Sequence, residues 1–187
     1  MKDVTIIALV GMPGAGKGLC VAYLEQKGWP SVYLGGITVD EVKRRGLEVN
    51  EENEKMVREE LRTNEGMDVM AKRILPKIDA LVSEGARTVI ADGIYSWAEY
   101  KVFKERYGKN AVIIAVASAR QTRHERLRNR PVRPLNEEEA TAREYAEIEN
   151  SDKGGPIANA DHTVINDSSP EETYAQLEAI LRAHSLA

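Results

Sequence analysis

The stretch "VTIIALVGMPGAGKG", residues 4–18, decides the fold of this chain. The run of β-branched and apolar residues from 4 to 10 predicts a strand in a sheet that is covered on both faces. The glycines that follow let the backbone curl so that its N–H groups point inward, and a helix that begins near Gly16 adds the positive end of its dipole. With Lys17 in the next position, the pattern G-x-x-x-x-G-K predicts a loop that binds nucleotide phosphates.

The loop predicts a bound nucleoside triphosphate, ATP or GTP, with Lys17 on the outer phosphates. The residues expected to contact this nucleotide are Gly11, Met12, Pro13, Gly14, Ala15, Gly16, Lys17, Gly18 and Leu19. An ordinary glycine turn between a strand and a helix is the alternative interpretation. The position of Lys17 and the strand in front of the loop favour the nucleotide site.

A magnesium ion is the expected companion of the nucleotide. The position after Lys17 usually carries a hydroxyl that contacts Mg²⁺, and here it holds Gly18. Cys20 is a soft ligand that suits this cation poorly, whereas phosphates, waters and one carboxylate can hold it. Asp92 ends the predicted strand "TVIAD", and we expect it to hold Mg²⁺ through water. The alternative is an ordinary Asp in a strand-to-helix turn.

Size and composition exclude several classes of protein. The chain has 187 residues, 42% of them apolar, which suits one α/β domain with a substantial core. A net charge of −4 argues against nucleic-acid or anionic-membrane partners, and 5% aromatic residues argue against a base-stacking surface. Residues 4–10 are too few to span a membrane. The single cysteine, Cys20, fits a reducing compartment, and we expect a cytoplasmic monomer or homodimer.

Predicted strands and helices alternate along the chain. The strands are expected at residues 4–10, 31–34, 88–91, 111–117 and 162–165. The helices are expected at residues 16–27, 96–107, 120–128, 137–150 and 170–184, with three more between 38 and 83. This alternation predicts a single α/β domain, a three-layer sandwich around a five-stranded parallel sheet. Two segments, about 36–84 and about 120–150, look like insertions over the edge of the sheet where ligands bind.

Residues 120–133 form a strongly basic segment. They contain six arginines and one glutamate, a formal charge of +5. A charge run is usually a solvated helix face. This one follows the fourth predicted strand, where a closing lid would stabilise a transferring phosphate with guanidinium groups. Arg143 could reach back from the next helix, although an ion pair with Glu147 one turn on is the simpler expectation.

These motifs give the chain a resemblance to the P-loop nucleoside monophosphate kinases. "GMPGAGKG", residues 11–18, is similar to the adenylate-kinase form of the loop, and "ADGIYS", residues 91–96, resembles the Asp-Gly segment after the third strand. Most of the chain resembles an archaeal-type family described as adenylate-kinase-related or dephospho-coenzyme-A-kinase-like. Its recurring segments are similar to "KRRGLEVNEEN", "LRTNEGMDVMAKR" and "ADGI" here. The resemblance implies a P-loop NTPase core, a helical acceptor-binding insertion and an arginine-rich lid.

The resemblance also implies roles for single residues. "ERLRNR", residues 125–130, looks like the Arg-Leu-x-x-Arg stretch of P-loop kinases, which gives Arg126 and Arg130 a catalytic role beside Lys17 and Asp92. The expected acceptor-binding residues are Arg62, Gly93 and Tyr95, and Asn166 lies where such kinases hold the nucleotide base. Adenylate kinases have phosphate-binding arginines at two positions that hold Val39 and Tyr95 in this chain.

The sequence leaves three functions open. The first is ATP-dependent phosphoryl transfer to a small nucleotide or nucleotide-like acceptor, which needs positioning and charge neutralisation more than covalent chemistry. The second is a hydroxyl kinase of the dephospho-coenzyme-A type, for which Asp92 is the carboxylate best placed to act as a base. The third is a nucleotide-binding regulatory module with little or no kinase activity, and the intact basic segment argues against it.

Overall fold

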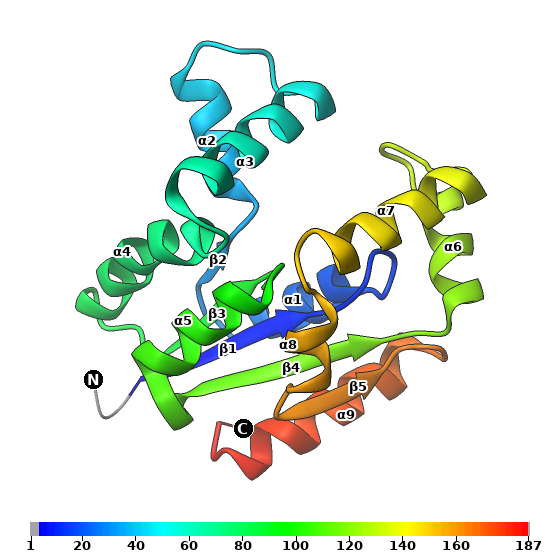
Figure 1. Cartoon of the computed structure of the whole chain (residues 1–187). Coiled ribbons are helices and arrows are strands. Elements are labelled where there is room, and N and C mark those ends of the chain that lie inside the picture. Colours follow the sequence, from blue (N-terminus) through cyan, green and yellow to red (C-terminus); the bar gives the residue numbers. More distant parts are fainter. Residues whose placement is uncertain (1–3, 187) are drawn as a thin grey trace.

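The computed structural model describes residues 4–186 and contains one parallel sheet (Figure 1). Its five strands are β1 (Thr5–Val10), β2 (Ser31–Tyr33), β3 (Thr88–Asp92), β4 (Ala111–Ala117) and β5 (His162–Ile165). They lie in the order β2-β3-β1-β4-β5, and every neighbouring pair is parallel. The predicted five-stranded parallel sheet is therefore confirmed, with each strand within one residue of its expected ends.

Helices connect the strands. They are α1 (Lys17–Glu25), α2 (Gly36–Arg44), α3 (Glu51–Glu65), α4 (Val69–Ser83), α5 (Trp97–Tyr107), α6 (Arg120–Asn129), α7 (Glu137–Glu149), α8 (Gly154–Ala158) and α9 (Pro170–Ala183). A single 3₁₀ turn covers Gly108–Asn110. The sequence pattern predicts all the longer helices but not α8, because its sequence "GGPIA" begins with two glycines and a proline, the residues that favour helices least. No helix within residues 4–186 has the length and apolarity needed to cross a membrane.

The sheet is buried on both faces, which explains its nearly continuous apolar strands. On β1, Ile7 and Leu9 face α1 and α9, where they pack in one cluster with Leu24 and Leu181. Ile6, Ala8 and Val10 alternate with them and face α4 and α5. Because successive side chains of a strand point to opposite faces, one short strand contributes to both cores. The result is the predicted three-layer sandwich.

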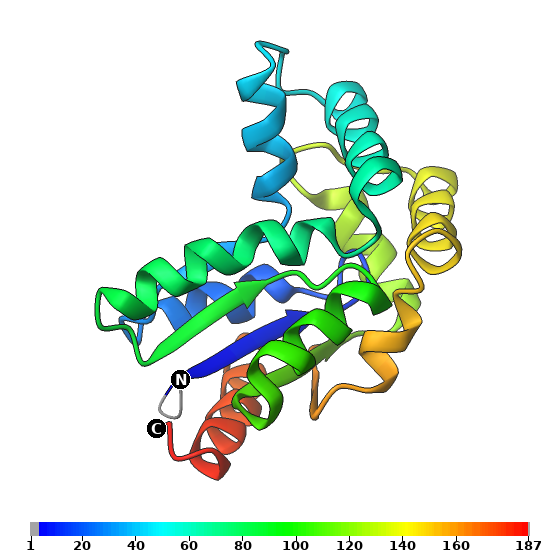
Figure 2. The same ribbon diagram turned by 60° about the vertical axis from the view of Figure 1, so that its left-hand side comes forward.

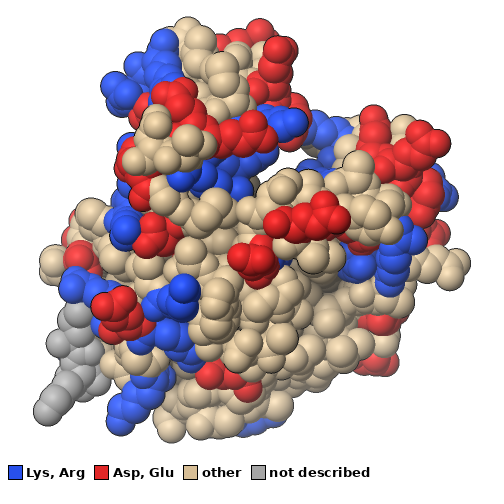
Figure 3. Space-filling model, viewed as in Figure 1, with Lys and Arg blue, Asp and Glu red and all other residues tan. Residues whose placement is uncertain are grey.

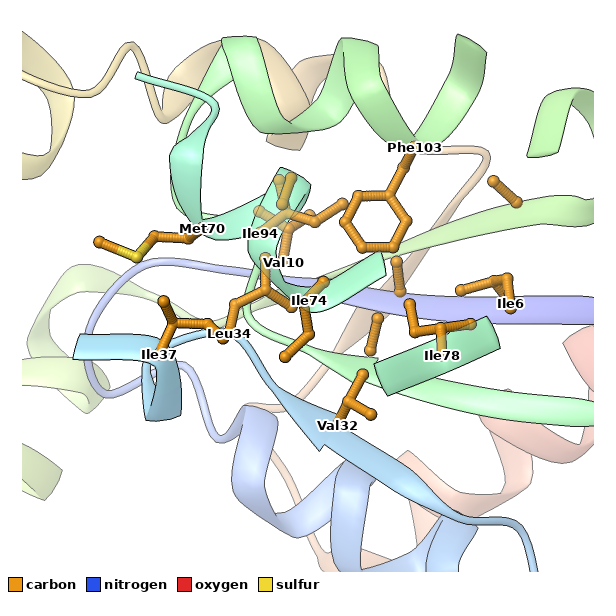
Figure 4. Close-up of a cluster of buried hydrophobic side chains, with 14 of the residues drawn as sticks. Ile6, Val10, Val32, Leu34, Ile37, Met70, Ile74, Ile78, Ile94 and Phe103 are labelled. Carbon is orange, nitrogen blue, oxygen red and sulfur yellow. The ribbon is translucent and has the colours of Figure 1, made fainter. Parts of the chain in front are cut away.

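The core on the α4 and α5 side extends from the sheet to the base of α2 (Figure 4). Phe103 of α5 and Ile74 and Ile78 of α4 are almost fully buried against Ile6 and Val10. Ile37 of α2 and Met70 of α4 belong to the same cluster. This packing joins the first turn of α2 to the body of the domain.

Two helical arms stand over the carboxyl ends of the strands (Figures 1 and 2). The first arm contains α2 and α3, and the second contains α6 and α7. Arg133, in the loop before α7, joins the two arms, because its Nη1 lies 3.1 Å from Glu51 Oε2 and its Nη2 lies 3.0 Å from Glu54 Oε1. These arms lie within the two segments, about 36–84 and about 120–150, expected from the sequence to be the acceptor-binding insertion and the lid. The first segment also contains α4, which packs on the sheet and is part of the core.

Candidate functional site

The loop between β1 and α1 has a backbone that requires glycine at two positions. Gly14 has φ +79° and Gly16 has φ +93°, the left-handed region that favours glycine. A Cβ at Gly14 would lie 2.5 Å from the carbonyl oxygen of Arg123, and one at Gly16 would lie 2.0 Å from Asn166 Nδ2. A Cβ at Gly18 would meet no atom of residues 4–186 within 4 Å, so packing does not dictate glycine there.

Side chains from three other elements hold this loop from behind. Asn166 is 3% exposed, and its Nδ2 donates to the Ala15 carbonyl at 2.9 Å. Thr173 Oγ1 donates to Asn166 Oδ1 at 3.0 Å and so fixes the amide. Arg126 donates from Nη2 to the Asn166 carbonyl at 2.8 Å and from Nη1 to Ser118 Oγ at 3.0 Å.

Arg126 and Asn166 therefore lie beside the loop, and neither lines the cavity in front of it. The side-chain amide of Asn166 donates to the loop, and the backbone carbonyl of Asn166 accepts hydrogen bonds from Arg126 and Ser118. The sequence led us to expect the Arg126 guanidinium to contact the transferring phosphate, and its place beside the loop differs from that expectation. Its present contacts make it a residue that positions the loop.

The phosphate-loop cavity, in front of the loop, has a volume of about 350 Å³. Its loop lining consists of Gly11, Met12, Pro13, Gly14, Ala15, Gly16, Lys17 and Gly18. Leu19, the last residue expected to contact the nucleotide, is not part of the lining. Lys17 Nζ lies 3.4 Å from Asp92 Oδ1, at the carboxyl ends of neighbouring strands β1 and β3. The predicted cation and carboxylate thus share one site.

The carboxylate of Asp92 fits a magnesium ion only in part. Residues 4–186 contain no group of three or more His, Cys, Asp or Glu side chains that could hold a metal. Hard oxygen donors suit Mg²⁺, which keeps several waters and is usually bound by few carboxylates together with substrate phosphates. Asp92 would therefore supply one carboxylate to an ion held mainly by a bound nucleotide.

A larger cavity of about 680 Å³ lies between the two arms. Residues of α2, α3 and α7 and of the loop before α7 line it. Figure 3 shows a hollow between α3 and α7 with Lys and Arg side chains at its edges. The residues that line both cavities are Tyr33, Tyr95, Arg130, Arg143 and Glu147. The two cavities therefore meet beside the phosphate loop.

Arg62, at the end of α3, lines the larger cavity. Its Nη1 donates to Ser151 Oγ at 3.3 Å, and its Nε is buried without a hydrogen-bond partner among residues 4–186. Burial lowers the pKa of this guanidinium, although the nearby carboxylate of Glu99 opposes the shift. A partly desolvated cation that has no carboxylate partner among residues 4–186 is suited to bind an anion.

Two tyrosines stand where the cavities meet. Tyr95 Oη and Tyr33 Oη are 3.4 Å apart, and burial raises the pKa of Tyr95. Gly93 makes room for the Tyr95 ring, because a Cβ on Gly93 would lie 2.9 Å from that ring. Lys153 Nζ lies 4.9 Å from the centre of the Tyr95 ring, in a cation–π arrangement. Nothing in the local sequence around Lys153 predicts its presence at the site.

The guanidinium of Arg130 is available at the junction. It lines both cavities, its Nε donates to the carbonyl of Arg133, and it forms no ion pair with a carboxylate of residues 4–186. Burial and the neighbouring charges of Arg143 and Arg133 lower its pKa. Arg143 Nε lies 3.4 Å from Glu147 Oε1, so the expected ion pair forms within the site.

Behind the tyrosines lies Glu99, a fully buried carboxyl on α5. Its Oε2 accepts from the backbone N–H of Tyr95 at 2.6 Å and of Ser96 at 3.2 Å, which completes a capping box. Its Oε1 has no partner among residues 4–186. Burial raises the pKa of Glu99 to about 7, although these amides and the charges of Arg62 and Lys153 oppose the shift.

The raised pKa of Glu99 makes the stability of the fold depend on pH. The pKa of Glu99 is higher in the folded protein than in the unfolded chain. Its contribution to the free energy of unfolding is therefore most favourable below pH 4.5 and is lost as the pH rises through about 7. Glu99→Gln removes the charge and keeps an acceptor for the two amides. We expect urea denaturation at pH 8 to show Glu99→Gln more stable than the natural protein by roughly 3 kcal/mol.

Near pH 4.5 the natural protein and Glu99→Gln should have similar free energies of unfolding. Glu105→Gln, an exposed change on the same helix, is the control and should follow the natural protein at both values. A constant difference between Glu99→Gln and the natural protein from pH 4.5 to 8 would show that the carboxyl titrates normally.

Comparisons with known proteins show relatives over nearly the whole chain. A family model described as an AAA domain matches residues 7–149. A UPF0200 protein of Thermococcus kodakarensis is 36% identical over 179 residues, which cover 94% of this chain and 96% of the relative. A UPF0200 protein of Hyperthermus butylicus is 36% identical over 178 residues, which cover 94% and 92% of the two chains.

Solved structures share the fold at lower identity. TT1252 from Thermus thermophilus has a TM-score of 0.67 at 20% identity and covers 97% of this chain and 98% of its own. A shikimate kinase from Bacteroides thetaiotaomicron has a TM-score of 0.60 at 17% identity, covering 97% and 99%. A gluconokinase from Sinorhizobium meliloti has a TM-score of 0.55 at 12% identity, covering 98% and 96%. The resemblance to P-loop kinases is thus confirmed for the fold, and the chain belongs to the UPF0200 family.

Proposed function

We propose that this protein is an ATP-dependent kinase that transfers a phosphoryl group to a small nucleotide or nucleotide-like acceptor. One observation carries the proposal: the phosphate-loop cavity and the larger cavity between the arms share five lining residues. A donor bound at the loop and an acceptor bound between the arms would meet at those residues. Phosphoryl transfer needs this juxtaposition, because positioning and charge neutralisation supply most of the catalysis.

The donor side consists of the loop, Lys17 and Asp92. The amides of a loop whose shape depends on Gly14 and Gly16 would bind the inner phosphates, and Lys17 would bind the outer ones. Mg²⁺, held with help from Asp92 through water, would neutralise charge that develops on the phosphates. Gly18 leaves open space on the cavity side of the loop.

The acceptor side consists of Arg62, Gly93 and Tyr95. The guanidinium of Arg62, which lines the larger cavity and forms no ion pair with a carboxylate of residues 4–186, supports binding of an anionic group such as a monophosphate. Gly93 has no side chain, so the Tyr95 ring can lie between the proposed acceptor and donor sites. Arg130, which has no carboxylate partner in residues 4–186, would stabilise the phosphoryl group in transit. Arg126 would contribute by holding the loop.

A hydroxyl group is the second candidate acceptor, as in a kinase of the dephospho-coenzyme-A type. Such an acceptor needs a base, whereas an acceptor phosphate is already ionised. The carboxylate of Asp92 lines the phosphate-loop cavity and can approach an acceptor that enters from the larger one. Two of the solved structures with a similar fold are a shikimate kinase and a gluconokinase.

The compartment proposed for this reaction is the cytoplasm. Cys20 is the single cysteine of the chain, and it is buried in the core beside α9. Burial raises the pKa of its thiol to about 11, so it is unreactive at neutral pH. A chain without a disulfide is suited to a reducing compartment.

The test of the function is ADP formation from Mg-ATP with a panel of acceptors. The panel contains the common nucleoside monophosphates, dephospho-coenzyme A, shikimate and gluconate. We expect at least one nucleotide-like member to raise ADP formation by about tenfold or more over the rate without acceptor, because an oriented acceptor replaces water. Stimulation by a non-phosphorylated hydroxyl compound alone would favour the second candidate. Nucleotide binding without stimulation by any member would favour a regulatory module and contradict the kinase.

A further inference from the structure

Lys153 is a buried cation in the phosphate-loop cavity. It lies in the turn between α7 and α8 and is 2% exposed. Its Nζ donates to Glu147 Oε2 and rests over the ring of Tyr95. The cavity that it lines also contains Lys17 and Asp92. Burial lowers the pKa of Lys153, the Glu147 carboxylate opposes this shift, and the nearby charge of Lys17 adds to it.

The carboxylates that line the phosphate-loop cavity do not balance the cations that line it. Glu147 is its one ion-pair partner within residues 4–186, and the same carboxylate pairs with Arg143. The cations that line the phosphate-loop cavity are Lys17, Arg130, Arg143 and Lys153, whereas the carboxylates are Asp92 and Glu147. Burial of an ammonium is costly unless it is well paired. The excess positive charge therefore indicates an anion as the missing partner.

We infer that Lys153 is a catalytic residue that contacts the outermost phosphate of the nucleotide and follows it during transfer. This inference rests on the proposed function. When the nucleotide binds, the ammonium exchanges part of its contact with Glu147 for a phosphate oxygen, and no covalent bond is made or broken by Lys153. Lys153 follows α7, in the helical arm that contains Arg130 and Arg143, and it lines the same cavity as the phosphate loop.

A purely structural ion pair is the competing explanation. In that case Lys153 and Glu147 would serve only to hold the end of α7 against α8. Removal of either partner would then have the same consequence, because each variant breaks the same contact. If Lys153 binds phosphate, the two variants have opposite effects. Loss of Lys153 removes a cation that attracts the phosphate. Loss of the Glu147 charge removes a group that competes for Lys153 and repels the phosphate.

The experiment is calorimetric titration of the full chain with Mg-ADP and with the non-hydrolysable analogue Mg-AMP-PNP at pH 7. We expect Lys153→Met to weaken AMP-PNP binding by about tenfold or more, the loss typical of a hydrogen bond between charged groups. The affinity for ADP should change by less than about threefold. Glu147→Gln should strengthen AMP-PNP binding by roughly two- to fivefold. Lys153→Arg should retain most of the affinity.

Lys27→Met is the control, because it breaks a more exposed Lys–Glu pair, Lys27 with Glu178, outside both cavities. It should leave both affinities unchanged. Equal weakening of AMP-PNP and ADP by Lys153→Met and Glu147→Gln would overturn the inference and show a structural pair, with the proposed function intact. The same holds if neither variant changes AMP-PNP binding. Failure of the natural protein to bind either nucleotide would overturn the proposed function, and this inference with it.

Discussion

Lys17→Ala is expected to lower the rate of ADP formation by on the order of 10²–10³-fold, the loss usual for one preorganised charge-stabilising donor. Lys17 Nζ is in the phosphate-loop cavity, 3.4 Å from Asp92. Its removal takes away the cation proposed to bind the outer phosphates and leaves the Asp92 carboxylate without its partner. Both changes place uncompensated negative charge where more negative charge develops during transfer.

The measurement compares steady-state ADP formation by the natural protein and Lys17→Ala with the most effective acceptor. Lys101→Ala, an exposed change on α5, is the control for expression and folding. The thermal unfolding midpoint of each variant separates loss of structure from loss of chemistry. Turnover by Lys17→Ala within about threefold of the natural rate would exclude the loop as the site of phosphate transfer.

Arg130→Ala should reduce turnover on the order of 10³-fold while nucleotide affinity changes little, because arginines that act on a phosphoryl group in transit have effects of this size. Arg130 lines both cavities and has no carboxylate partner in residues 4–186. Its charge is thus available at the junction of donor and acceptor. The observable is the maximal rate at saturating ATP, together with the dissociation constant for Mg-ADP.

Arg126→Ala provides the contrast within the same helical segment. Arg126 donates to the Asn166 carbonyl and to Ser118, next to the loop. Its loss should weaken Mg-ADP binding as well as turnover, because the loop itself loses support. If Arg126→Ala slowed turnover without affecting binding, and Arg130→Ala did the reverse, the roles proposed for the two arginines would be exchanged.

The strands and the loop could be predicted from the sequence because their signals are local. An uninterrupted apolar run such as residues 111–117 fits few structures other than a strand buried on both faces. The glycines and Lys17 are adjacent in the sequence, and they are adjacent in the site. Asp92 could be predicted because parallel neighbouring strands end at the same edge of the sheet.

The remaining part of the site depends on distant contacts. Glu99 and Lys153 are charged residues of a kind that is usually exposed, and no local pattern marks them as buried. Arg126 was expected on the phosphates from its motif, but its contacts depend on Asn166, which lies 40 residues further along the chain. Tyr95 fills the position of an expected arginine, and a lysine from the turn after α7 lies over its ring.

The contact between Arg133 and α3 has a kinetic consequence. The side chains of Arg133 and Glu51 are 46% and 63% exposed, so dissolved salt readily screens their attraction. Because these ion pairs join the arms across the larger cavity, added salt will favour separation of α3 from the loop before α7. The same ions would weaken the attraction of Arg62 and Arg130 for the proposed anionic acceptor. For the proposed kinase, fast product release and efficient substrate capture would therefore favour opposite ionic strengths.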